Sequence, residues 1–175
     1  MTAFTAQGML SPEENTMLLL ALCEKKRGGL YDLPGVPRAA EGIAALRPRD
    51  ESEACAWQRM VLRDGLAAAL LLCDGLKNGP LQTLKEGLPE THILTRDVDC
   101  QISDKGRILH TLCDQTTLPH TLGEGVRIRH DRGFATIVPD AHRGLVRVTS
   151  ESGDSEFARE LCDFYSREIQ KITNV

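Results

Sequence analysis

The chain has 175 residues, of which 41% are hydrophobic and 4% aromatic, so it can bury a sizeable core made of aliphatic side chains rather than rings. Its formal net charge of -4 provides no general attraction to nucleic acid or to an anionic membrane, and its longest apolar run, Leu66 to Cys73, is far shorter than the roughly 20 residues of a membrane-spanning helix. The N-terminus lacks the basic start of a signal peptide, so we expect a cytoplasmic protein of one domain, or of one domain and a fragment, without nucleic-acid or membrane partners.

The first predicted element is a helix that begins at Pro12. Ser11 is a suitable cap, and Glu14 lies three residues after it. The residues of the following apolar stripe are Met17, Leu18, Leu20, Ala21 and Leu22. Gly28-Gly29 is expected to end this helix.

The next segments predict a strand and further helices. GLYDLPGVP indicates a short strand and a proline-bounded turn, and Arg38 to Leu46 suits a helix. From Glu51 to Leu76 the pattern indicates one long helix, or two helices broken near Asp64-Gly65. The second half of this region is nearly all alanine and leucine, so we expect it to be buried on most sides.

Asn78-Gly79-Pro80 is the clearest break in the chain, because Asn-Gly forms turns and the proline resists helix continuation. It divides a mainly helical segment, residues 1–77, from a second domain, residues 78–175. That domain is predicted to begin with a short helix over Leu81 to Leu88 and a strand, HILTRDVDC. Ser103 is then predicted to cap a helix that runs to about Leu112.

Three strands and a helix are predicted to complete the chain. The strands are GVRIRH, GFATIV and GLVRVTSE, separated by Asp131-Arg132-Gly133 and by the DAHRG turn. The last helix begins near Asp154 and extends to about Ile172. The fold class is therefore α+β, with an antiparallel sheet of about four strands and helices on one face.

The cysteines and histidines do not have the spacing of a metal site. The six cysteines stand at 23, 55, 73, 100, 113 and 162, and the five histidines are scattered singly. No CxxC pair occurs, and most of the cysteines fall within apolar helical patterns. We expect reduced cysteines and no bound metal.

Four short sequence segments, in this order, resemble the C-terminal domain of the α-D-phosphohexomutases, the family of phosphoglucomutase and phosphomannomutase. They are DGLAAALLLCDGL, VDCQISDKGRILHTL, GVRIRHDRGFATIVPD, and IVPDAHRGLVRVTSES with the acidic helix after it. Phe134 stands where the family has a tryptophan. The segment LYDLPGVPRAAEGIAAL is similar to a word of the third domain, which implies that residues 1–77 are a shortened third domain.

The resemblance implies an isomerase of carbohydrate metabolism, but the catalytic parts of that family are missing from this sequence. The family uses a phosphorylated serine, an Asp-Gly-Asp-x-Asp loop for magnesium and a Gly-Glu-x-Ser-Gly loop for the sugar. Phosphoryl transfer needs such positioning and a metal ion. We therefore expect no catalytic residue and no cofactor on this chain, since Mg²⁺ is implied only for a complete mutase. The implied role is a supporting or phosphosugar-recognising part of a mutase-type protein.

The turn VPDAHRG corresponds to the family's phosphate-binding turn, roughly Arg-Pro-Ser-Gly-Thr-Glu-Pro. Val138, Asp140 and His142 replace its arginine, serine and threonine. In one interpretation His142 and Arg143 are replacement donors, and the five turn residues still bind a hexose phosphate. These five residues are Asp140, Ala141, His142, Arg143 and Gly144. In the other, which the loss of family donors favours, Asp140 pairs with Arg143 in a solvated turn.

Two further hypotheses concern partners. Arg127 and Arg129 alternate along one strand, and Arg147 lies on a nearby one, so together they are a possible accessory cationic strip for a phosphorylated ligand. Arginines that alternate along strands more often lie on the solvent-exposed face of a sheet. The alternative function is a degenerate, non-catalytic domain that binds a protein partner through residues 11–77. A further alternative is that this chain is a fragment of a longer enzyme, whose remaining mutase domains hold the serine and the metal loop.

Overall fold

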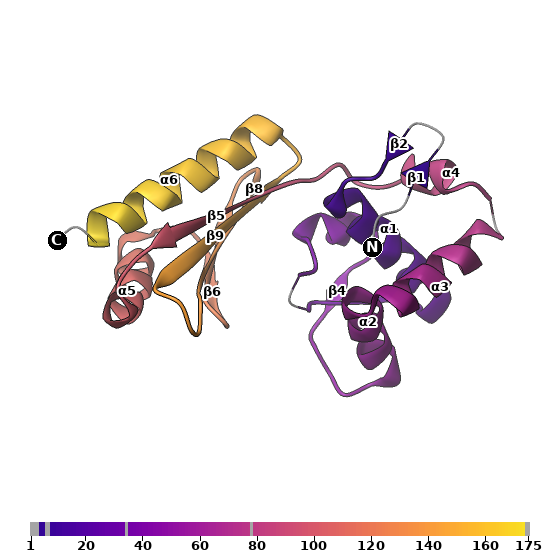
Figure 1. Ribbon diagram of the computed structural model, residues 1–175, viewed down its shortest axis with the longest axis horizontal. Helices are drawn as coiled ribbons and strands as arrows, with labels where there is room; N and C mark the ends of the chain where they lie inside the picture. Colours follow the sequence, from indigo (N-terminus) through magenta and orange to yellow (C-terminus); the bar gives the residue numbers. More distant parts are fainter. Residues whose placement is uncertain (1–3, 6–7, 34, 78, 174–175) are drawn as a thin grey trace. The chain divides into compact units, whose positions relative to one another are not determined.

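The structure is a computed structural model, and it describes residues 4–5, 8–33, 35–77 and 79–173. The chain forms two compact units, Met1–Thr91 and His92–Val175 (Figure 1). The short helix α4 (Leu81–Lys85) belongs to the first unit, where Lys85 pairs with Glu14 at 2.7 Å. The domain division between residues 77 and 78, with its assignment to a shortened third domain, stays a prediction.

The first unit begins with a short antiparallel pair, β1 (Phe4–Thr5) and β2 (Gly8–Met9), followed by helix α1 (Pro12–Arg27). The predicted cap of α1 is confirmed. The Ser11 hydroxyl accepts the Glu14 N–H at 3.1 Å, and the Glu14 carboxylate accepts the Ser11 N–H at 2.8 Å. The helix ends at Gly28, whose φ of 70° is left-handed backbone that favours glycine.

The predicted helix over Arg38 to Leu46 is wrong. A short 3₁₀ helix, η1 (Arg38–Gly42), occupies its first half, and strand β4 (Leu46–Arg47) its end. β4 pairs in parallel with β3 (Leu30–Tyr31). Two physical reasons oppose the helix: glycine costs it about 1 kcal/mol relative to alanine, and ladder bonds to β3 hold the β4 backbone extended.

The region from Glu51 to Leu76 forms two helices, α2 (Glu53–Arg63) and α3 (Gly65–Leu76), so the break predicted at Asp64-Gly65 is confirmed. The Asp64 carboxylate caps α3 by accepting the N–H groups of its second and third residues. The expectation that this half is buried on most sides is wrong. Only one stripe of α3 is buried, on the side where α1 and α2 pack against it; the stripe comprises Ala68, Leu71, Leu72 and Gly75.

The second unit is built on a five-stranded antiparallel sheet in the order β5-β9-β8-β7-β6. Its strands are β5 (His92–Asp99), β6 (His120–Leu122), β7 (Val126–His130), β8 (Gly133–Pro139) and β9 (Leu145–Ser152). The predicted strands are confirmed, and β6 is one more than expected. All three residues of β6 are exposed at the sheet edge, so no apolar alternation marks it in the sequence.

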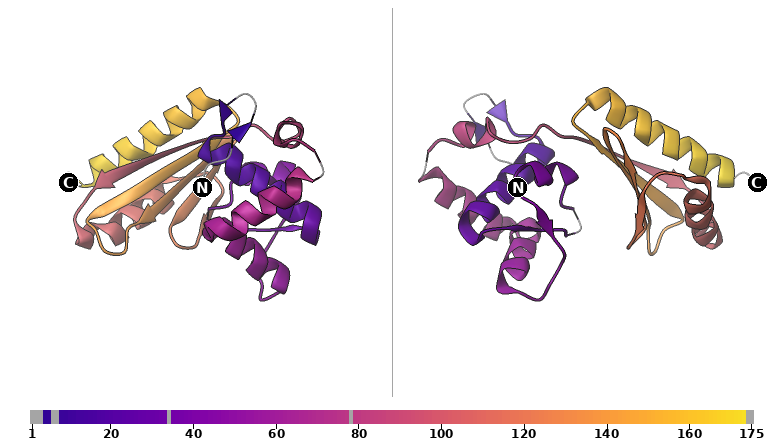
Figure 2. Two further views of the ribbon diagram at one scale, coloured as in Figure 1. Left: turned by 45° about the vertical axis from the view of Figure 1, so that its right-hand side comes forward. Right: turned by 180° about the vertical axis from the view of Figure 1, so that it is seen from behind.

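Helices cover one face of this sheet, as predicted. Helix α6 (Ser155–Thr173) lies along the sheet, and α5 (Lys105–Gln115) packs beside it (Figure 2). Asp154 caps α6 by accepting the N–H groups of Glu156 and Phe157. Ser103 is not the cap of α5, because it lies inside a 3₁₀ turn, η2 (Ile102–Asp104), that precedes the helix.

The two faces of the sheet differ in chemistry. The covered face contributes alternate apolar residues to the core of the second unit, among them Ile128, Ile137 and Val148. The residues between them face away from the helices, and this open face is mainly polar. None of the described helices is long and apolar enough to cross a membrane.

The candidate anion-binding turn

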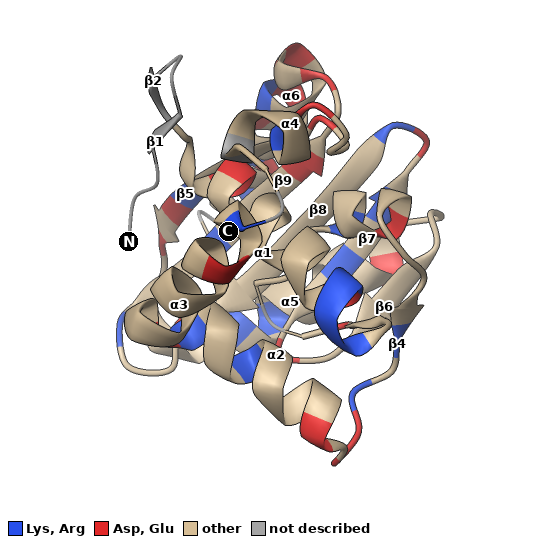
Figure 3. Cartoon of the chain, turned by 90° about the vertical axis from the view of Figure 1, so that its right-hand side faces the viewer, with Lys and Arg blue, Asp and Glu red and all other residues tan. Residues whose placement is uncertain are grey.

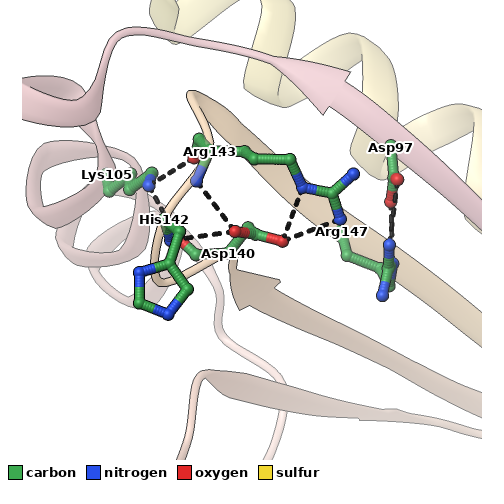
Figure 4. A network of polar contacts seen from close by, with 6 residues as sticks. All are labelled: Asp97, Lys105, Asp140, His142, Arg143 and Arg147. Atoms are coloured by element: carbon green, nitrogen blue, oxygen red, sulfur yellow. Dashed lines mark hydrogen bonds and ion pairs between the residues drawn. The ribbon is translucent and has the colours of Figure 1, made fainter.

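The candidate site is the turn of residues 140–144 between β8 and β9, and its centre is the carboxylate of Asp140 (Figure 4). Oδ1 of this carboxylate accepts the backbone N–H of His142 at 2.9 Å and that of Arg143 at 2.8 Å. Oδ2 accepts Nε and Nη2 of Arg143 at 3.2 and 3.0 Å. The Asp140 side chain therefore accepts hydrogen bonds from two backbone N–H groups and from the Arg143 guanidinium.

These hydrogen bonds favour the ionised form of Asp140. The backbone N–H groups of His142 and Arg143 contribute most, followed by the Arg143 guanidinium, and together they hold the pKa of Asp140 well below its usual range. The Asp140 side chain is 19% exposed, whereas that of Arg143 is 64% exposed. The carboxylate is thus the inner, fixed partner of the pair.

Lys105 holds the same turn from its other side. Its ammonium group donates to the carbonyl oxygens of Asp140 at 2.5 Å and of Arg143 at 2.6 Å. The turn therefore directs carbonyl groups toward a cation and N–H groups toward a carboxylate. Successive N–H groups that point at one oxyanion occur in anion-binding turns, and here an aspartate of the turn itself accepts them, as in an Asx turn.

Gly144 completes the turn where it meets Cys100, the residue that follows β5. Its carbonyl oxygen accepts the Cys100 N–H at 2.9 Å. A Cβ at residue 144 would lie 2.7 Å from the Cys100 carbonyl oxygen, so this close approach requires glycine. Ala141 and His142 are exposed, and the His142 ring points away from the Asp140 carboxylate (Figure 4).

The three arginines of the predicted cationic strip all project from the open face of the sheet. Arg147 forms a two-pronged ion pair with Asp97, with Nε–Oδ1 and Nη2–Oδ2 distances of 2.7 and 2.9 Å. Arg127 donates through Nε to the Thr136 hydroxyl at 3.3 Å.

The Arg129 guanidinium lies 6.0 Å from the centre of the Phe134 ring. Each of the three cations therefore has its own neighbour on the sheet, and none of the hydrogen bonds described above links them to the turn.

Two residues of the network were not among the predicted site residues. Asp97 is placed by strand register, because it stands opposite Arg147 in the β5–β9 ladder. Lys105 lies within the segment VDCQISDKGRILHTL, but nothing in the sequence indicates that it reaches carbonyl groups 35 and 38 residues away. Within the described ranges, no three His, Cys, Asp or Glu side chains form a group that could hold a metal ion.

Comparison with known proteins bears on the fold. No sequence-family model matches the chain, and no curated protein matches it. Its structure is similar to a crystal structure of a phosphoglucomutase/phosphomannomutase family protein from Burkholderia thailandensis, with a TM-score of 0.65 and 13% sequence identity. The match covers 98% of this chain and 44% of the other, so the chain spans less than half the length of that protein. The resemblance inferred from the sequence is confirmed at the level of the fold: this chain folds like part of a phosphoglucomutase/phosphomannomutase family protein.

Proposed function

We propose that this chain is a supporting, non-catalytic module of a phosphoglucomutase/phosphomannomutase-type protein, and that its β8–β9 turn is an anion site occupied by its own Asp140 carboxylate. The observation that carries the proposal is the pair of hydrogen bonds from the His142 and Arg143 N–H groups to one Asp140 oxygen, at 2.9 and 2.8 Å. The similar fold supports the mutase-like part of the proposal.

The donors that Asp140 takes up are those that a phosphate group would need. Two N–H groups of a tight turn and a guanidinium fork together suit an oxyanion. A phosphosugar would have to displace a carboxylate that is covalently tethered beside these donors, and the two negative charges would repel each other. On this reasoning Asp140 occupies these donors and prevents recognition of a hexose phosphate, while Lys105 holds the turn through the carbonyl groups of Asp140 and Arg143.

The test is a titration of inorganic phosphate, glucose 1-phosphate and mannose 1-phosphate into the full chain, followed through the backbone amide signals of residues 140–147 at low salt. We expect no saturable shift in the wild type at millimolar ligand. Asp140→Ala should free the donors and produce saturable shifts with phosphate. Asp140→Asn should not, because its amide oxygen can still accept both N–H groups without the charge.

A double variant and an off-site variant complete the design. Adding Arg143→Ala to Asp140→Ala should remove the phosphate response, since the guanidinium is then missing. Asp131→Ala, which removes a carboxylate outside the turn, should behave as the wild type. Saturable shifts in the wild type that vanish in Arg143→Ala would instead show a turn that recognises phosphosugars as it stands, and the supporting role would be abandoned.

A second candidate function is favoured by one observation in the first unit. Leu66 and Leu70 of α3 are 71% and 63% exposed, and Met60 of α2 is 46% exposed. Exposed apolar side chains that form a contiguous patch often mark a protein interface, and Leu66 and Leu70 lie one turn apart on α3. The corresponding function is that of a non-catalytic domain that binds a protein partner through its helical unit. Leu70→Asp should abolish such binding without affecting any response of the β8–β9 turn.

A further inference from the structure

We propose that Lys105 is the positioning residue of the β8–β9 anion site, because its ammonium group sets the direction of the two N–H groups that meet the anion. The inference rests on the proposed function, which says what those N–H groups bind, and it adds how the fold directs them. Lys105 acts through the backbone: it donates to the carbonyl oxygens of Asp140 and Arg143, at 2.5 and 2.6 Å (Figure 4).

Within residues 139–146, all of which the structure describes, one backbone hydrogen bond of the antiparallel ladder is missing. Asp140 and Leu145 stand opposite each other just beyond the last ladder pair of β8 and β9, and the Asp140 N–H donates to the Leu145 carbonyl oxygen at 3.1 Å. In a complete pair the Leu145 N–H would return the bond. It donates instead to the Arg143 carbonyl oxygen at 2.8 Å. The Asp140 carbonyl oxygen is left for Lys105, which thereby replaces the missing backbone donor.

Lys105 holds the two peptide groups that flank the donors. Its two acceptors belong to the peptide groups 140–141 and 143–144, whereas the N–H groups of His142 and Arg143 belong to the two peptide groups between them. Because each peptide group is planar, a fixed carbonyl direction fixes the orientation of the whole group. With both outer groups held, the two inner N–H groups are directed at one acceptor, the Asp140 carboxylate oxygen.

Lys105 can hold the turn because its own backbone is anchored in the core of the second unit. It begins α5, and Ile108 and Leu112 of that helix are buried in this core. The preceding segment is tied to the same turn, since the Cys100 N–H donates to the Gly144 carbonyl oxygen at 2.9 Å. Lys105 is itself partly buried. The position of α5 therefore determines the shape of the anion site.

A general effect of positive charge is the alternative explanation, and the chain offers a matched control for it. Basic and acidic residues are interspersed over the second unit (Figure 3), so no large region of one sign acts on the turn. Arg107 lies two residues further along α5 and is exposed, with its guanidinium 3.2 Å from Asp104. Arg107→Met removes a cation from the same part of the helix and leaves the contacts of Lys105 in place.

The first test follows the turn in the full chain without added ligand. An NMR titration of the Asp140 carboxyl reports its pKa, which the N–H groups of His142 and Arg143 hold well below the usual range. Lys105→Met should raise this pKa toward the ordinary value of an aspartate, and amide hydrogen exchange at residues 142 and 143 should become at least about tenfold faster. Lys105→Arg should restore the low pKa and the slow exchange, and Arg107→Met should leave both unchanged.

The second test uses inorganic phosphate and the Asp140→Ala background, in which the proposed function expects the donors to be free. Lys105→Met in that background should weaken phosphate binding by at least about tenfold, whereas Lys105→Arg and Arg107→Met should not. The amide signals of α6 report whether each variant is folded. If Lys105→Met unfolds the chain, Lys105→Gln repeats both tests with a polar side chain that is too short to reach both carbonyl groups.

The outcomes separate this inference from the proposed function. An Asp140 pKa and exchange rates that Lys105→Met leaves unchanged, or that Arg107→Met changes equally, would overturn the role of Lys105. If Asp140→Ala binds phosphate and the added Lys105→Met does not weaken it, the inference fails while the proposed function stands. If Asp140→Ala binds no phosphate, the proposed function fails, and the titration and the exchange rates still decide the role of Lys105.

Discussion

Replacing Gln58 tests whether its buried side-chain amide makes the backbone hydrogen bonds that a second neighbouring strand would otherwise make. Gln58 is 1% exposed and comes from α2, and it meets the backbone of Tyr31 in β3. Its Oε1 accepts the Tyr31 N–H at 2.9 Å, and its Nε2 donates to the Tyr31 carbonyl oxygen at 2.9 Å. Because Tyr31 turns both groups away from β4, these groups would have no other partner in the first unit's core.

The magnitude follows from the two orphaned groups. Gln58→Leu leaves a buried N–H and a buried C=O without hydrogen bonds, at about 1–3 kcal/mol each. The buried leucine side chain returns about 1.5–3 kcal/mol of hydrophobic transfer energy. We therefore expect a net loss of about 2 kcal/mol in the free energy of unfolding of the first unit. Gln58→Ala, which adds a cavity without that return, should lose about 2 kcal/mol more.

Two measurements check this prediction. Urea unfolding should report the loss of stability, and hydrogen exchange should show that the Tyr31 amide loses its protection in Gln58→Leu. Gln170→Leu makes the same change at an exposed position of α6 and should alter stability by less than about 0.5 kcal/mol. An unchanged Tyr31 exchange rate, with stability equal to that of the Gln170 variant, would refute the strand-mimic reasoning.

Three other predictions concern the sheet, a histidine and the thiols. Gly133→Ala should destabilise the second unit by about 2–3 kcal/mol in urea unfolding, because its Cβ would lie 2.2 Å from the Glu151 carbonyl oxygen; Gly123→Ala, with no neighbour within 4 Å, should not. Burial lowers the pKa of His130, whose Nε2 lies 2.9 Å from the Tyr165 hydroxyl oxygen, so its contribution to stability should be lost as pH falls below the unfolded value of about 6.5. His130→Phe should make the free energy of unfolding depend less on pH than His120→Gln does. The same pH dependence in both variants would contradict this role of His130. Brief maleimide treatment should label the exposed Cys73 but not the buried Cys23, whose pKa burial raises to about 12; equal labelling by mass spectrometry would contradict this.

Elements with a complete local signal were predictable from the sequence. The Ser11–Glu14 capping box, the Asp64 break and the Asp154 cap each depend on side chains that bond to backbone a few positions away. The alternation in β7, β8 and β9 is equally local, because period two sets which residues enter the core. These features, together with four ordered words, were enough to indicate the mutase-like α+β fold.

The failures share a cause that lies outside the local sequence. Leu46 and Arg47 are extended because β3 pairs with them, and β6 exists because β7 offers it an edge. The sequence predicts that the outer face of α3 is buried, but the structure leaves it exposed. An aliphatic helix can be covered on one side or on several, and its sequence does not distinguish the two. The helix propensity and hydrophobic periodicity of a segment do not indicate which distant segment will pair with it.

The sequence alone determined the donors and the charge of the candidate turn: an aspartate, an arginine and a glycine between two strands. It also determined that the pairing of Asp140 with Arg143 was possible, because they are three residues apart. Only the tertiary structure decided that the carboxylate turns inward onto two N–H groups, that Lys105 holds the carbonyl groups behind them, and that Asp97 engages Arg147. Those contacts depend on strand register and on the approach of α5, which are set by the burial of a shared core and not by neighbours in the chain.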